Sequence, residues 1–259
     1  MAAAAPVPAS KVRSEGFILE SHLARPDNLD PSFPGLVLVH GFPSGVVHSS
    51  AASASFPELA DRIAADMGWV VLTISFRGAG QSEGDFSLKG WLTDLEAAID
   101  HLQALDRVSG VWLAGFGTGG ALSICAGARR PEVQGVIALA APADFDDWAS
   151  HPRRLLQHAR EMELITSAGF PRSLDAWSRE LRDIRPSEAV AQLAPRAFMV
   201  VHGSEDDAVP QFDARILSDA HGSAEMRIIA GAGHQLRYDP RAVAVLLGWL
   251  DRQKHRVAR

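Results

Sequence analysis

The chain has 259 residues, of which 47% are hydrophobic, 22% are charged and 22 are glycines. This composition is typical of a globular domain with a sizeable core, and it excludes a disordered chain, a collagen-like chain and a coiled coil. The formal charge of −6, from 25 basic and 31 acidic residues, leaves no positive surplus for binding nucleic acid or an anionic membrane surface. We therefore expect a cytoplasmic protein that acts on a small molecule, without nucleic-acid or membrane partners.

The cysteine content, the N-terminal segment and the length of the apolar runs exclude several further classes of protein. The single cysteine, Cys125, excludes an internal disulfide, a thiolate zinc cluster and a CxxC redox pair. The start resembles a signal peptide only weakly, because Lys11 and Arg13 follow the apolar run instead of preceding it. We predict a disordered leader over residues 1–14 and a single domain over residues 15–259. The longest apolar runs are too short to span a bilayer.

Short apolar runs alternate with longer segments of helical period along most of the chain. In chain order, the first half predicts a strand at 35–40, a helix at 59–67, a strand at 69–76, a helix after the N-cap residue Ser87, a strand at 110–115, a helix from Thr118 and a strand at 136–141. The second half predicts a strand at 197–202, a helix at 212–220, a strand at 225–229 and a closing helix from Pro240. Alternating strands and helices of this kind favour an α/β fold with a mostly parallel central sheet and helices on both faces.

The alternation breaks between about residues 144 and 186, where no strand-like run occurs. This segment contains Trp148, Leu164, Phe170 and Trp177 among several charged residues. We interpret it as a short helical cap, inserted over one end of the sheet, whose aromatic side chains suit an apolar ligand or form the core of the cap itself.

Five predicted strands end in turns with unusual chemistry. In open parallel sheets, ligands bind at the carboxyl ends of the strands, so these turns are the candidate site. They are His40-Gly41-Phe42-Pro43, the stretch from Arg77 to Gly84, Gly115-Phe116-Gly117-Thr118-Gly119-Gly120, the stretch from His202 to Pro210, and Gly231-Ala232-Gly233-His234.

In this order and spacing, the five turns resemble the α/β-hydrolase superfamily, and most of all its small bacterial esterases, acyl-peptidases and dienelactone hydrolases. The resemblance covers about residues 15–255. It implies that Asp206 is the acid and His234 the base of a catalytic triad. It also implies that the backbone N–H groups of Phe42 and Thr118 form the oxyanion hole, and that Arg77 anchors its own loop without a catalytic role.

The sequence departs from this superfamily at the nucleophile. The motif G-x-S-x-G places a serine on a sharp turn between a strand and a helix. Here Gly115 and Gly119 flank the turn, but the central position is Gly117. Glycine supplies no oxygen or sulfur for an acyl-enzyme, although it relieves the backbone strain of such a turn. We therefore expect the nucleophile position to be vacant.

Other residues offer weaker alternatives at this site. Thr118 is displaced by one residue, which redirects its side chain at a tight turn, and Cys125 falls two helical turns farther on, where a small core residue is expected. We interpret Ser44 and Ser82 as turn residues whose hydroxyls form local hydrogen bonds. Gly115, Gly117 and Gly120 also fit G-x-G-x-x-G, but at least three strand-like segments precede them, whereas a dinucleotide site belongs to the first strand–helix unit. We expect no cofactor and no metal.

Three functional hypotheses remain open at this point. The protein is a hydrolase or lyase in which the Asp206–His234 dyad and the oxyanion hole act on an ester or acyl bond of a small apolar substrate without an acyl-enzyme. Alternatively, it is an inactive ligand-binding or regulatory protein on the hydrolase scaffold. In the third reading, it is a serine esterase in which glycine has replaced the serine. The substrate and the oligomeric state, including a homo-oligomer, stay open.

Overall fold

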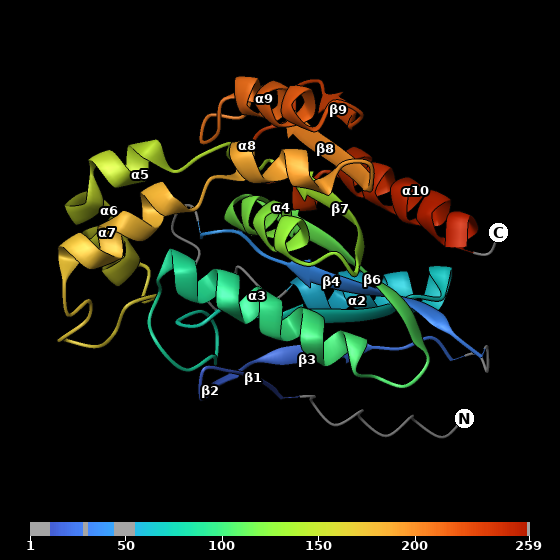
Figure 1. Ribbon diagram of the computed structural model, residues 1–259, viewed down its shortest axis with the longest axis horizontal. Coiled ribbons are helices and arrows are strands. Elements are labelled where there is room, and N and C mark those ends of the chain that lie inside the picture. Colours follow the sequence, from blue (N-terminus) through green and yellow to red (C-terminus); the bar gives the residue numbers. More distant parts are fainter. Residues whose placement is uncertain (1–10, 28–30, 44–54, 258–259) are drawn as a thin grey trace.

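A central sheet of seven strands organises the part of the chain that the computed structural model describes, which is residues 11–27, 31–43 and 55–257. The strands are β3 (Ser21–Ala24), β4 (Phe33–Val39), β5 (Val70–Ile74), β6 (Val108–Phe116), β7 (Val133–Leu139), β8 (Ala197–Gly203) and β9 (Glu225–Ile229). Their order is β3-β5-β4-β6-β7-β8-β9, and all neighbours are parallel except β3 and β5 (Figure 1). The prediction of a mostly parallel sheet in an α/β fold is confirmed.

A small antiparallel pair precedes the sheet, formed by β1 (Val12–Ser14) and β2 (Phe17–Leu19). Val12 and Leu19 are almost fully buried in the core. The expected disordered leader is therefore wrong for its last residues, 12–14, while residues 1–10 lie outside the described part. Because β1, β2 and β3 are only three or four residues long, they are too short to produce a periodic pattern in the sequence.

Helices cover both faces of the sheet, because successive strand residues point to opposite sides. Val37 and Val39 belong to one buried cluster, whereas Leu36 and Leu38 belong to the other. The first cluster is covered by α3 (Leu88–Gln103), α4 (Thr118–Arg129) and α9 (Gln211–His221), and the second by α2 (Ser55–Met67) and α10 (Pro240–Val257). Ser87 caps α3 as predicted, because its Oγ accepts a hydrogen bond from the Gly90 N–H at 3.0 Å.

The segment between β7 and β8, where the alternation breaks, is helical. It contains α5 (Asp146–Ser150), α6 (Pro152–Glu161), α7 (Leu174–Asp183), α8 (Pro186–Ala189) and the 3₁₀ turn η1 (Val190–Leu193). Figure 1 shows α5, α6 and α7 gathered at one end of the molecule. Asp85 ties this segment to the rest, because its Oδ1 accepts hydrogen bonds from the N–H groups of Thr166 and Ser167 at 2.9 and 3.0 Å.

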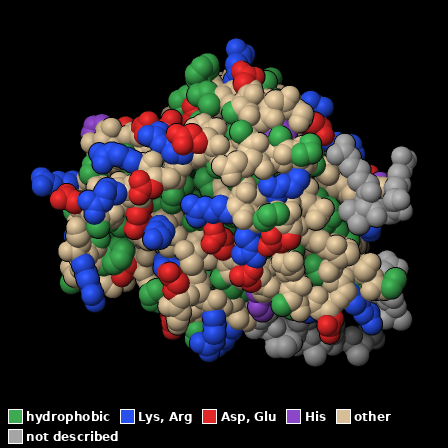
Figure 2. Space-filling view, viewed as in Figure 1, with side chains coloured by type: hydrophobic (Ala, Val, Ile, Leu, Met, Phe, Trp, Pro, Cys, Tyr) green, Lys and Arg blue, Asp and Glu red, His purple; other side chains and the backbone are tan. Residues whose placement is uncertain are grey.

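The surface carries both signs of charge. On the face in Figure 2, Lys and Arg side chains are interspersed with Asp and Glu, without a large area of one sign. Among the described residues, no helix combines the length and the apolar character needed to cross a membrane.

Candidate active site

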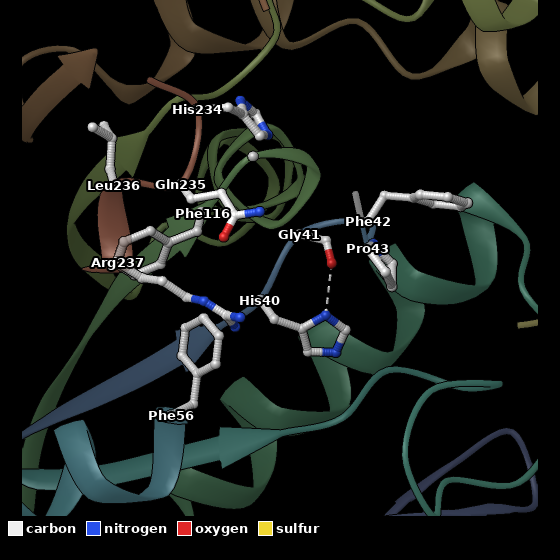
Figure 3. A pocket seen from close by; sticks show the side chains of 11 residues that line it. His40, Gly41, Phe42, Pro43, Phe56, Phe116, His234, Gln235, Leu236 and Arg237 are labelled. Carbon is white, nitrogen blue, oxygen red and sulfur yellow. Dashed lines mark hydrogen bonds between the residues drawn. The ribbon is translucent and has the colours of Figure 1, made fainter. Parts of the chain in front are cut away.

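The predicted site residues come together at the carboxyl edge of the sheet. His40, Gly41 and Phe42 follow β4, and Gly117 follows β6; with His234, from the loop after β9, they line one cavity (Figure 3). Thr118 lines an adjoining cavity that shares Phe42 and His234 with the first. Asp206, in the loop after β8, contacts His234 directly. All five residues predicted for the catalytic centre and the oxyanion hole therefore lie in one region.

The turn between β6 and α4 has the backbone that this position requires. Gly117 has φ 52° and ψ −125°, a conformation that residues with a Cβ rarely adopt. Its N–H donates to the Leu139 carbonyl at 2.8 Å, which fixes the turn against the neighbouring strand β7. A Cβ on Gly115 would clash with the Gly119 backbone, and one on Gly119 would clash with the His40 carbonyl. Close backbone approach therefore explains both flanking glycines.

A side chain at Gly117 would meet no such obstacle. The atom nearest to an ideal Cβ built there is Nε2 of His234, at 3.4 Å, which is an ordinary van der Waals contact. Gly117 thus differs from Gly115 and Gly119: its surroundings leave space for a small side chain, and this space is directed at the imidazole.

Asp206 and His234 form a buried acid–base pair. His234 Nδ1 lies 2.9 and 3.1 Å from the two carboxylate oxygens of Asp206. The Asp206 side chain is fully buried, whereas that of His234 is 19% exposed. Because a carboxylate only accepts hydrogen bonds, His234 Nδ1 carries the proton and Nε2 is left free to accept one. Nε2 is the nitrogen that faces the space at Gly117.

Asp206 remains ionised because several donors surround it. Burial alone would raise its pKa, but hydrogen bonds from His202, His234 and the Val209 N–H hold the pKa well below its usual range. Oδ1 accepts from the N–H groups of Ala208 and Val209 at 3.0 and 2.9 Å. The negative charge can therefore stabilise a positive charge that develops on His234 during a reaction.

His202 is a second imidazole in contact with Asp206, a contact that the sequence did not reveal. Its Nε2 lies 3.3 Å from Asp206 Oδ2 and 3.0 Å from the Val209 carbonyl oxygen, and its side chain is fully buried. Both neighbours are acceptors, so Nε2 carries the proton. Burial lowers the pKa of His202, but these two contacts outweigh it and raise the pKa. His202 therefore holds Asp206 in place together with His234.

The expected oxyanion hole lies where the β4 turn contacts the β6 turn. A Cβ on Gly41 would lie 2.7 Å from the Phe116 carbonyl oxygen and 3.3 Å from the backbone N of Thr118. The two backbone segments that carry the predicted donors, Phe42 and Thr118, are thus in close contact, as two N–H groups aimed at one oxyanion require.

His40 fixes the β4 turn by using both ring nitrogens. Its Nε2 accepts from the Phe76 N–H at 3.1 Å, so Nδ1 is protonated and donates to the Gly41 carbonyl at 2.8 Å. Burial lowers the pKa of His40 to about 4, with a further contribution from the positive charge of Arg237. His40 is therefore neutral near pH 7 and shapes the turn that carries Phe42.

This neutral, buried histidine is expected to make the protein sensitive to acid. As the pH falls from 6.5 towards 4, the unfolded chain takes up a proton at His40 before the folded protein does, so the folded state loses about 3 kcal/mol of stability. Urea unfolding of the wild type and His40→Gln at pH 7 and pH 4.5 should show a smaller pH effect in the variant. A His40 imidazole that titrates near pH 6.5 by NMR would contradict this expectation.

A larger cavity of about 470 Å³ lies between the predicted site and the segment 144–186. Trp148 and Phe145 line it together with Phe42, Thr118 and His234. The other apolar residues singled out in this segment do not line it: Trp177 and Leu164 are buried in the core, and Phe170 packs against that core. Their role is structural, and Trp148 is the aromatic residue of the set that faces the cavity.

Two of the alternative nucleophiles, Ser82 and Cys125, are placed poorly for catalysis. Ser82 Oγ is committed to the Ser75 carbonyl at 2.6 Å, away from the cavities, while Ser44 lies outside the described residues. Cys125 is buried, and burial raises its pKa to about 12, so it carries no thiolate near pH 7. In the described ranges, no group of three or more His, Cys, Asp or Glu residues is arranged to hold a metal ion.

Comparison with known families identifies the family to which the chain belongs. The sequence profile of the alpha/beta hydrolase family matches residues 36–246. The match spans most of the chain, including the turns with Gly117, Asp206 and His234. The chain therefore belongs to the alpha/beta hydrolase family. No curated protein sequence matches it significantly.

Solved structures match over nearly the whole chain. Est1E from Butyrivibrio proteoclasticus, solved with ferulic acid, has 21% sequence identity and a TM-score of 0.73, and the match covers 97% of this chain and 100% of Est1E. GrgF, an alpha/beta hydrolase from a Penicillium species, has 19% identity and a TM-score of 0.73, with 96% and 100% covered. The meta-cleavage product hydrolase CumD from Pseudomonas fluorescens has 17% identity and a TM-score of 0.65, with 94% and 98% covered. At these identities the likeness establishes the fold.

Proposed function

We propose that this protein hydrolyses an ester or other acyl bond of a small, largely apolar substrate, with the Asp206–His234 pair activating water in place of a serine. One observation carries the proposal: His234 Nε2 is the nearest atom to the empty Cβ position at Gly117, 3.4 Å away. The space that a serine side chain would fill lies beside a nitrogen able to accept a proton. A water molecule fits the same role there.

The reaction follows from the positions of these groups. A water molecule gives a proton to His234 Nε2 and attacks the substrate carbonyl carbon, while Asp206 stabilises the imidazolium. The backbone N–H groups of Phe42 and Thr118 hold the oxyanion of the tetrahedral intermediate. When the intermediate collapses, the C–O bond to the leaving group breaks, and the departing alkoxide takes the proton from His234. The products are a carboxylic acid and an alcohol, without an acyl-enzyme.

The test is to replace the base and follow hydrolysis of p-nitrophenyl acetate and butyrate. His234→Ala is expected to lower kcat/KM by about 100-fold or more, because it removes the general base. His255→Ala provides a matched control, since His255 lies on α10 and is exposed. Equal rates in the wild type and His234→Ala would overturn the proposal.

The absence of an acyl-enzyme gives a second readout. Intact-mass spectra during turnover should show no acylated protein, and a fluorophosphonate should not label residue 117, because glycine offers no nucleophile. Saturable binding of small acyl compounds without hydrolysis of any of them would favour the alternative function, a ligand-binding protein on the hydrolase scaffold.

A further inference from the structure

Arg237 is a half-buried cation that follows closely after His234, in the 3₁₀ turn η2 (Leu236–Tyr238). Its guanidinium carbon lies 5.4 Å from the ring centre of Phe56 and 4.3 Å from that of Tyr238. Nη2 donates a hydrogen bond to the Tyr238 hydroxyl. The rings of Phe56 and Tyr238 and the hydroxyl of Tyr238 therefore hold the guanidinium, which leaves most of its five N–H donors for another partner.

No carboxylate pairs with Arg237 among the residues that the structure describes, whereas other arginines of the same region do have one. Arg241 pairs with Asp239, and Arg252 pairs with Glu225. Burial lowers the pKa of Arg237, as expected for a cation removed from water without an anionic neighbour. A cation that is partly removed from water and has no counter-charge is unfavourable, so the Arg237 guanidinium is available to an anion.

The guanidinium lines the same cavity as the candidate active site. This cavity measures about 70 Å³ and is also lined by Gly117 and His234, with Phe56, Phe116 and Leu236 as apolar walls (Figure 3). A cavity of this size suits a group as small as a carboxylate. His40 lines it as well but is neutral, so Arg237 supplies the positive charge there.

We propose that Arg237 binds a carboxylate on the acyl part of the substrate. The substrate is then a monoester or monoamide of a short dicarboxylic acid, with its reacting carbonyl at His234 and its carboxylate at Arg237. Because both residues line one small cavity, only a few carbon atoms separate the two groups. The larger cavity of about 470 Å³, which shares Phe42, Pro43 and His234 with the small one, takes the apolar leaving group. This inference rests on the proposed hydrolase function.

The test compares the binding of two probes that contain no ester bond. One is 4-oxopentanoate, in which two methylene groups separate a carboxylate from a ketone. The other is its neutral isostere, 4-oxopentanamide. Ligand-observed NMR titrations should show that the wild type binds the carboxylate at least about 10-fold more tightly, because a charge-assisted bidentate pair is available only to the anion. Arg237→Gln should abolish this preference, and Arg237→Lys should retain part of it. Arg215→Gln, an exposed arginine on α9, should leave the preference unchanged.

The binding comparison tests the role of Arg237 without relying on turnover. Equal binding of the two probes to the wild type would overturn it, and this comparison stands even where Arg237→Gln fails to fold. A full carboxylate preference in folded Arg237→Gln would overturn it as well. Carboxylate binding without any ester hydrolysis would refute the proposed function while leaving Arg237 as an anion site. Ester hydrolysis without a carboxylate preference would refute the role of Arg237 alone.

Discussion

Gly117→Ser is expected to react covalently with a fluorophosphonate and to hydrolyse p-nitrophenyl esters at least about 100-fold faster than the wild type. The reason is that the other parts of a serine hydrolase are already in contact. Asp206 orients His234, whose Nε2 lies 3.4 Å from the ideal Cβ position at residue 117. An added hydroxyl would therefore lie within reach of the base that must take its proton.

The substitution should also cost stability, because φ at Gly117 is +52°. A residue with a Cβ in such a conformation costs of order 1–3 kcal/mol. Gly117→Ala is the matched control, since it carries the same strain but no hydroxyl. It should be destabilised to the same degree and gain neither labelling nor activity. A folded Gly117→Ser that remains unlabelled would mean that the His234 dyad cannot activate a hydroxyl at this turn.

The sequence predicted the main body of the fold because the central strands β4, β5, β7 and β8 are buried along almost their whole length and read as continuous apolar runs. β9 (Glu225–Ile229) and the start of α10 at Pro240 match the predicted bounds. The strands that escaped prediction are short and lie at the periphery, where pairing with a neighbour rather than burial defines them. β3 illustrates this: it is recognisable only through its antiparallel register with β5, in which Ser21 is opposite Ile74.

The candidate site likewise contains residues that the sequence could predict and residues that it could not. Asp206 and His234 could be predicted because each follows a strand within a recognisable turn, and parallel strands bring their ends to one edge. His202 and Arg237 could not, because their importance depends on contacts that have no sequence signal. His202 looks like a strand residue until its Nε2 is placed 3.3 Å from Asp206, and Arg237 looks like a surface cation until its cavity is known.

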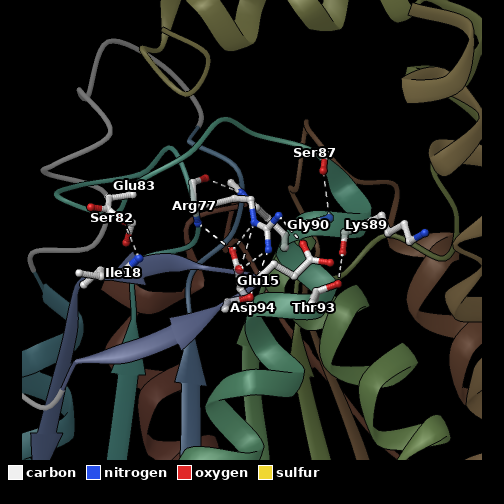
Figure 4. A network of polar contacts seen from close by, with 12 residues as sticks. Glu15, Ile18, Arg77, Ser82, Glu83, Ser87, Lys89, Gly90, Thr93 and Asp94 are labelled. Carbon is white, nitrogen blue, oxygen red and sulfur yellow. Dashed lines mark hydrogen bonds and ion pairs between the residues drawn. The ribbon is translucent and has the colours of Figure 1, made fainter. Parts of the chain in front are cut away.

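The largest stability effect is expected from the ion pair that holds the loop after β5. Arg77 donates to Asp94 from its backbone N–H at 2.9 Å, from Nε at 3.1 Å and from Nη2 at 2.7 Å (Figure 4). The two side chains are 7% and 0% exposed. Trp91 Nε1 donates to the Arg77 carbonyl at 2.9 Å. Nη1 of Arg77 pairs with the exposed carboxylate of Glu15. This network confirms that Arg77 anchors its own loop.

Asp94→Asn should therefore lower the free energy of unfolding by about 3–5 kcal/mol, because the neutral amide leaves the buried guanidinium without its main counter-charge. Glu96→Gln, two residues along on α3, is the matched control: its pair with Arg129 is at 3.4 Å, and the two side chains are 27% and 56% exposed. Removing this partly solvated pair should change stability by less than about 1 kcal/mol. Urea unfolding at pH 7 measures both. Similar losses in the two variants would mean that burial adds nothing to the Arg77–Asp94 pair, and that Glu15 is sufficient to compensate the charge of Arg77.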